Sequence, residues 1–189
     1  MQKAFRLVLF VSICVLTNAC NVIVSKKATV TGEISHLGKS ELYISQFKGD
    51  SMLICDTVYS SESGKFSFET RPLDSLTSVN IYFNDNDCWT TLFVNAGDEI
   101  RISGDMELVD LLEIKGGKVN DELNEFKSSI KNLYIERHDI LSDKSNNGVD
   151  NPELRLAEIN LDLCRSAKDF IINHPSSIAS VVIIQDFFY

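Results

Sequence analysis

The chain has 189 residues, of which 44% are hydrophobic and 24% are charged, with only three prolines and nine glycines. That composition excludes a collagen-like fibre, a low-complexity disordered chain and a polytopic membrane protein. Eighteen basic against 27 acidic side chains give a net charge of −9. An acidic surface repels phosphate backbones, so we expect no nucleic-acid partner.

Residues 1–19 have the pattern of a secretory signal peptide. Lys3 and Arg6 form a short positive segment before the apolar run 7–16. A helix of that length spans about 15 Å, whereas a hydrocarbon core is about 30 Å thick, so the run is too short to cross a membrane. We therefore expect this segment to direct export.

The apolar run is followed by Ala19-Cys20, and a small residue directly before Cys resembles a bacterial lipoprotein signal. Thr17 departs from that pattern, which has Leu at the third position before the Cys. The resemblance implies that Cys20 is diacylated and begins the mature chain, with residues 20–27 as a lipidated tether. It also places the protein in the cell envelope, lipid-anchored to a bacterial membrane and facing the periplasm. The acyl chains hold the protein on the membrane, because each buried CH₂ contributes about 0.8 kcal/mol. Plain signal-peptidase cleavage and an uncleaved anchor are the alternatives.

Three cysteines follow the tether, Cys55, Cys88 and Cys164, and no CxxC occurs. An odd number of thiols in an oxidising compartment leaves at least one unpaired. A disulfide between Cys55 and Cys88 is one interpretation. Small core thiols without a disulfide are the interpretation that we favour.

From Ala28 onward the hydrophobic pattern has a period of two residues. Ala28, Val30 and Ile34 share one face of a predicted strand, with polar residues between them. Similar short strands recur, separated by turns that include residues 61–64 and 95–98, and the second of these turns is expected to join a final hairpin. No helical pattern intervenes. We predict the α+β class, with an antiparallel β-sandwich over residues 28–115 and a helical segment over 116–189.

The period changes to three and four residues after Gly117. Asn120 is the predicted N-cap of a helix that carries Leu123, Phe126, Ile130 and Leu133 on one face. Asn151-Pro152 begins a second predicted helix, because Pro is favoured at the first helical position. Its predicted apolar stripe consists of Leu154, Ala157, Leu161, Cys164, Ala167 and Ile171.

A third predicted helix, over residues 177–188 with Ser176 as its cap, is apolar on nearly every face. Such a helix must be buried on every face, since burial of one large apolar side chain is worth about 1.5–3 kcal/mol. Two amphipathic neighbours cannot cover it completely. We therefore expect self-association, hydrophobic dye binding or a protein partner at Ile178, Val182, Ile184, Phe187 and Phe188.

Several strings of the chain resemble one protein family. They lie at residues 30–34, 64–68, 93–100, 114–126 and 174–177. Residues 28–126 resemble the N-terminal domain of unknown function of Bacteroidota thioredoxin-like lipoproteins, a group of thiol–disulfide oxidoreductases that includes thiol peroxidase-like members. In those proteins a thioredoxin domain with a Trp-Cys-x-x-Cys motif follows the helical linker. This chain stops before such a domain could begin, so the resemblance implies the non-catalytic part, present as a truncated or split product.

No candidate site in the sequence has the spacing of a catalytic or metal centre. Cys88-Trp89 lacks a resolving Cys, and Asp85-Asn86-Asp87 lacks the later ligands of a calcium loop. His36, His138 and His174 are far apart, and Asp98 and Glu99 alternate in a strand and so point to opposite faces. We therefore expect no catalytic residues, no metal and no cofactor.

Two classes of function follow from the sequence. In the first, the chain is the non-catalytic, membrane-anchored domain that positions or recognises partners of a thiol–disulfide oxidoreductase-type lipoprotein. In the second, it is a stand-alone envelope lipoprotein that binds a protein, peptide or glycan and has no redox role.

Overall fold

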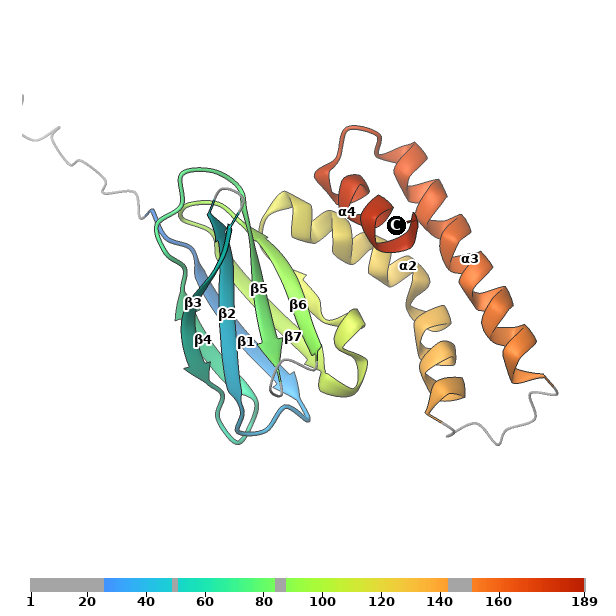
Figure 1. Cartoon of the computed structure of the whole chain (residues 1–189), viewed down its shortest axis with the longest axis horizontal. Coiled ribbons are helices and arrows are strands. Elements are labelled where there is room, and N and C mark those ends of the chain that lie inside the picture. The colour runs from blue at the N-terminus through green and yellow to red at the C-terminus, as the bar shows by residue number, and fades with distance from the viewer. Residues whose placement is uncertain (1–25, 49–50, 84–87, 143–150, 189) are drawn as a thin grey trace, which may run out of the picture.

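The computed structural model describes residues 26–48, 51–83, 88–142 and 151–188. They form a β-sandwich followed by a helical segment, which confirms the predicted α+β class. The helices lie beside one edge of the sandwich (Figure 1).

The described strands form two four-stranded sheets. The first sheet has the order β4-β1-β7-β8 and contains β1 (Thr29–Ser35), β4 (Lys65–Glu69), β7 (Glu99–Asp105) and β8 (Glu113–Lys115). The second sheet has the order β3-β2-β5-β6 and contains β2 (Glu41–Lys48), β3 (Ser51–Tyr59), β5 (Thr77–Phe83) and β6 (Cys88–Val94). A 3₁₀ helix, η2 (Met106–Leu111), connects β7 to β8.

Two predictions about strand pairing were wrong. The sequence pattern predicts an antiparallel sandwich, but β1 and β7 run parallel, whereas the other described strand pairs are antiparallel. The turn at residues 95–98 does not join a hairpin, because β6 and β7 belong to different sheets. The Asp98 carboxylate accepts a hydrogen bond from the Asn95 N–H at 2.7 Å, and the Asp98 C=O accepts one from the Thr29 N–H at 2.9 Å. These bonds turn the chain toward β1, so the turn is a corner between the sheets.

The predicted alternation within the strands is confirmed by burial. Val30 and Ile34 of β1 are fully buried, whereas the residues between and beside them that bear polar side chains are exposed. Gly32 also points inward, and the Phe66 ring of β4 lies directly over it, so that a Cβ at residue 32 would overlap the ring. The glycine therefore makes room for an aromatic side chain in the core.

Three helices follow the sandwich: α2 (Lys118–Leu141), α3 (Pro152–Asn173) and α4 (Ile178–Phe188). They enclose a second hydrophobic core, separate from that of the sandwich. Asn151 caps α3 by accepting a hydrogen bond from the Leu154 N–H at 3.1 Å, which agrees with the predicted helix start.

The predicted apolar stripe of α3 was wrong in its N-terminal half. Leu154 and Leu161 are 57% and 59% exposed. The buried positions of α3 are Ile159, Leu163, Ala167 and Phe170, of which Ala167 belongs to the predicted stripe. Ile171 of that stripe also packs against the helical core. Because α3 carries apolar residues on more than one face, two different apolar stripes run along the helix. Packing selects the stripe that contains Phe170, whose ring meets the Phe126 ring of α2 edge-on at 5.5 Å.

The predicted N-cap at Asn120 was also wrong, because α2 begins at Lys118 and Gly117 is the N-cap. Asn120 is 1% exposed, and its side chain bonds to an edge strand instead. Its Oδ1 accepts from the Phe93 N–H at 2.9 Å, and its Nδ2 donates to the Phe93 C=O at 2.7 Å. Asn124, one turn later, makes the same pair of bonds with Ile114 of β8, at 3.0 and 2.7 Å.

Phe93 lies on the edge strand of one sheet and Ile114 on the edge strand of the other. Unpaired edge groups favour aggregation and are commonly covered in native proteins. The start of α2 therefore closes one edge of the sandwich by presenting two side-chain amides in place of two neighbouring strands.

The helix α4 is capped by Ser177 rather than by the predicted Ser176. The Ser177 hydroxyl accepts a hydrogen bond from the Ala179 N–H at 2.9 Å and donates to the Glu122 carboxylate of α2. Ser177 is favoured because it can bond to both its own helix and α2. Ala179, Ser180 and Ile183 form the buried face of α4.

Candidate functional site

A cleft of about 570 Å³ lies where the sandwich meets the helices. We call it the β6 cleft. Strand β6 forms one wall, α2 and α4 form the opposite wall, and Val109 and Asp110 of η2 lie at its border. Its lining residues are Cys88, Trp89, Thr90, Thr91, Phe93, Val109, Asp110, Leu123, Phe126, Lys127, Ile130, Tyr134, Val182, Ile183, Asp186 and Phe187.

The strand wall of the β6 cleft is an open sheet edge. Asn120 binds both main-chain groups of Phe93, so these groups point away from β5. In an antiparallel strand the main-chain groups of alternate residues point to the same side. Those of Thr91 and Trp89 therefore face the same edge as those of Phe93. Among the described residues, no hydrogen bond is made to the main chain of Thr91 or Trp89 at this edge.

The helical wall of the β6 cleft is mainly apolar and is fixed by ring contacts. The Phe187 ring of α4 meets the Phe126 ring of α2 edge-on, with centroids 5.4 Å apart and an angle of 86° between the planes. Ile130 of α2 and Ile183 of α4 belong to this wall and are themselves buried. These contacts hold the two helices together, so the cleft is a preformed feature of the fold.

Three ionisable side chains give the β6 cleft its charge. The Lys127 ammonium donates to the Leu112 C=O at 3.2 Å, and burial lowers the pKa of Lys127. Burial raises the pKa of the Asp186 carboxyl. Asp110 is the third group. Within the described part of the chain, Lys127 makes no ion pair within 4.0 Å of either carboxylate. One cation and two anions therefore surround the cleft without being paired directly.

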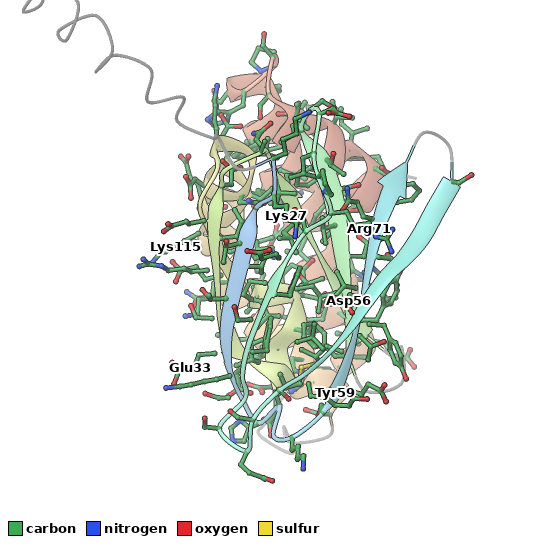
Figure 2. The ribbon with its side chains drawn as sticks, turned by 90° about the vertical axis from the view of Figure 1, so that its left-hand side faces the viewer. Lys27, Glu33, Asp56, Tyr59, Arg71 and Lys115 are labelled. Atoms are coloured by element: carbon green, nitrogen blue, oxygen red, sulfur yellow. The ribbon has the colours of Figure 1, made fainter. Side chains whose placement is uncertain are left out.

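A second, smaller hollow of about 310 Å³ lies at the opposite edge of the sandwich, between β3 and β4. Its charged lining residues are Lys27, Asp56, Glu69 and Arg71. Figure 2 looks onto this edge, with Lys27 and Arg71 near one end of it and Asp56 on β3. Because Lys27 bonds to Glu69 at 3.0 Å and the basic and acidic groups balance, the hollow is a weaker candidate for a binding site.

The three histidines do not come together. His36 bonds to Asp105 at 2.9 Å, and this hydrogen bond raises the pKa of His36. His174 stacks on Phe170, with ring centroids 4.2 Å apart, and His138 lies in the last turn of α2. Among the described residues no group of three His, Cys, Asp or Glu side chains is placed to hold a metal ion.

The cysteines are also separated. Cys88 lines the β6 cleft, and Cys164 lies half-buried on α3. Cys55 and Cys88 belong to β3 and β6, which have β2 and β5 between them. Three strand spacings amount to about 14 Å, whereas a disulfide requires Cα atoms within about 7 Å. The topology therefore excludes a Cys55–Cys88 disulfide within one chain.

Several predicted features lie outside the described residues, namely the signal peptide over residues 1–19, Cys20 with most of the tether over 20–27, and Asp85-Asn86-Asp87. Lipidation of Cys20 stays a prediction. Among the described helices, none has both the length and the apolar composition of a membrane span.

The residues predicted to meet a partner on α4 do not share one environment. Ile178 and Phe188 are 46% and 49% exposed, whereas Val182 and Ile184 are half-buried. The neighbouring Val181 is 62% exposed. Phe187 packs on Phe126, so it belongs to the helical core. The exposed apolar stripe of α4 is therefore Ile178, Val181 and Phe188, on the face opposite to Ile183.

Sequence reasoning missed the β6 cleft. Its strand wall is built from residues that alternate like any other strand, and Lys127 lies beside Phe126 in an ordinary amphipathic helix. The only signal was the Asn120-x-x-x-Asn124 spacing, which places two short amides on one face of a helix directly after a strand.

Comparison with known proteins identifies the family. The sequence model of the family described as "Domain of unknown function (DUF4369)" matches residues 28–123. The chain belongs to this family. The matched region covers the sandwich and the first turn and a half of α2, including Asn120. It therefore contains the strand wall of the β6 cleft and the helix start that fixes it. The search of curated proteins found no match.

Among solved structures, the chain is similar to the crystal structure of an (S)-allantoin synthase. The sequence identity is 4%, the TM-score is 0.36, and the similarity covers 50% of this chain and 45% of the other. The chain thus spans less than half of that protein's length. A similarity this weak supports no inference about fold or activity.

Proposed function

We propose that the chain is a non-catalytic recognition domain of the bacterial cell envelope, held at a membrane through a lipid on Cys20. The observation that carries the recognition role is the β6 cleft, because it combines a preformed apolar wall with an open strand edge and unpaired charged groups. Binding sites commonly are concave and mainly apolar, with a few polar groups that fix orientation.

The sequence supports the anchoring role. Lys3, Arg6 and the apolar run 7–16 precede a small residue and Cys20, which is the order of a lipoprotein signal. We expect the wild-type protein to fractionate with membranes and to carry acyl chains on Cys20. The Cys20→Ser variant should be released or remain an unprocessed precursor. An intact mass that shows a mature chain without lipid would refute the anchor.

The recognition role can be tested by site-specific crosslinking in cells. A photo-crosslinking residue at position 182 lies in the β6 cleft, whereas the same residue at position 181 faces solvent on the same helix. We expect a discrete protein adduct from position 182 and none from position 181. Equal adducts at both positions, or none at either, would contradict a recognition site in the cleft.

The identity of the adduct separates the two functional classes. A partner with a Trp-Cys-x-x-Cys motif supports a domain that serves a thiol–disulfide oxidoreductase, as the sequence resemblance implies. A partner without such a motif supports the stand-alone envelope lipoprotein with no redox role.

A further inference from the structure

We propose that the β6 cleft binds an extended peptide segment of a partner protein as an additional strand on β6, with one basic side chain of that segment beside Asp110 and Asp186. This inference rests on the proposed function and names the kind of partner that the cleft recognises.

The main-chain pattern of β6 requires an extended partner. Thr91 and Trp89 each present one N–H and one C=O toward the cleft, at the spacing of alternate residues in a strand. At Phe93 the same edge is already satisfied by the Asn120 amide, which imitates the groups of a neighbouring strand. An extended peptide continues that arrangement, because strand addition pairs main chain with main chain and leaves side chains for pockets.

The walls of the cleft suit alternating side chains. A strand added to β6 directs every second side chain toward one face. On that side, Leu123 and Phe126 of α2 and Val182 and Phe187 of α4 offer apolar contacts. An oligosaccharide would use ring stacking and hydroxyl bonds, and would leave the ordered row of main-chain donors and acceptors without a matching partner.

The charges favour a basic segment. Lys127 is the cationic lining residue among those described, against the carboxylates of Asp110 and Asp186. A Lys or Arg that enters the cleft balances the charge, whereas an acidic residue increases the excess of negative charge.

The chain itself supplies a reporter of binding. It contains one tryptophan, and Trp89 is 58% exposed at the open edge. The mature chain with Cys20→Ser can be titrated with a pool of blocked pentapeptides that have Lys at the centre, Thr at both ends and β-branched or aromatic residues between. We expect a saturable change in Trp89 fluorescence. The same pool with Glu at the centre should bind about tenfold more weakly, and added salt should reduce the difference.

Two pairs of variants locate the binding. Val182→Tyr fills the cleft and should abolish the fluorescence change, whereas Val181→Tyr on the solvent face should preserve it. Asp186→Asn should reduce the preference for Lys over Glu, whereas Asp169→Asn on the exposed face of α3 should not.

Peptides with N-methylated amides test strand addition itself. One set is methylated at odd positions and the other at even positions, so that only one set loses the amides that face β6. We expect one set to bind and the other to fail. Equal binding, or failure of both sets, would overturn strand addition; if Val182→Tyr still blocks the unmethylated pool, the cleft remains a recognition site and the proposed function stands.

Two further outcomes overturn the peptide inference. One is binding of a pool of neutral oligosaccharides, blocked by Val182→Tyr, with no binding of peptides. The other is no saturable binding of either pool. In the second case the crosslinking at position 182 decides separately whether the proposed function also fails.

Discussion

Asn120 and Asn124 bind the sandwich with the same pair of hydrogen bonds that a neighbouring strand would make. Each amide accepts from one edge N–H and donates to the C=O of the same residue. Asn120 also donates to the Gly116 C=O at 2.6 Å, which fixes the start of α2. These bonds decide where the closed part of the β6 edge ends and the open part begins.

Loss of the Asn120 amide should be costly. Asn120→Ala removes a buried amide and leaves the main-chain groups of the half-buried Phe93 without partners, and we expect it to lower the free energy of unfolding by about 2–3 kcal/mol. Asn124→Ala, at a half-buried position, should cost about 1 kcal/mol. Denaturant titrations measure both values. As a control, Asn132→Ala on the exposed face of α2 should change stability by less than about 0.5 kcal/mol. A cost at Asn120 no larger than that at Asn132 would refute the role of the amide.

At the scale of elements, α2 and α3 are joined by a charged contact near their connected ends. Arg155 donates to both carboxylate oxygens of Glu136, at 2.6 and 2.8 Å, and to Glu158 at 3.0 Å. The hydrogen bonds from Arg155 lower the pKa of Glu136 below its ordinary value of 4.5. Because the pKa is lower in the folded protein, the pair stabilises the fold fully above pH 4.5 and loses its effect as the pH falls through the lowered value.

The stability difference between wild type and Glu136→Gln should therefore depend on pH. We expect the wild type to be more stable by a constant amount from neutral pH down to about the ordinary pKa of Glu, and the difference to shrink at lower pH. Added salt should reduce it, since the pair is partly exposed. Glu125→Gln, an exposed change on the same helix, is the control. A stability difference that persists at strongly acidic pH would show that packing, not the ion pair, is responsible.

The helix α4 has one face in the core and one apolar face in solvent, and these faces should respond differently to Lys. Phe187→Lys removes the edge-on contact with Phe126 and should cost about 2–4 kcal/mol. Val181→Lys together with Phe188→Lys should cost less than about 1 kcal/mol and should reduce hydrophobic dye binding or self-association. Denaturation and sedimentation measure the two effects. If the change at Val181 and Phe188 unfolds the protein instead, that face is covered by contacts that the helices do not supply.

Local sequence patterns predicted where the helices and strands lie better than they predicted which elements pack against one another. The alternation around Val30 and the helix start at Asn151-Pro152 depend on residues close in the sequence, and both were confirmed. The parallel pair of β1 and β7, the stripe of α3 and the strand-like role of Asn120 depend on contacts between distant residues. The β6 cleft is of this second kind, because its walls come from β6, α2 and α4, and no single segment carries its signature.

At the scale of the whole molecule, the positions of the cysteines along the fold lie apart. Cys88 lines the cleft, Cys164 lies on α3, and the topology keeps Cys55 about three strand spacings from Cys88. A thiol that catalyses disulfide exchange needs a resolving partner. We expect the mature chain to reduce a model disulfide no faster than an equal concentration of a simple thiol. Turnover that disappears in a Cys55→Ser, Cys88→Ser or Cys164→Ser variant would contradict this expectation.

The measurement that tests the open edge most directly is amide hydrogen exchange in the free mature chain, residue by residue along β6. The Phe93 amide should exchange slowly, because it donates to the buried Asn120 side chain. The amides of Trp89 and Thr91 point into the cleft and should exchange much faster, while that of Thr90, which faces β5, should be protected like Phe93. Equally slow exchange at Trp89, Thr91 and Phe93 would contradict an open edge, and with it the site at which we expect a partner to bind.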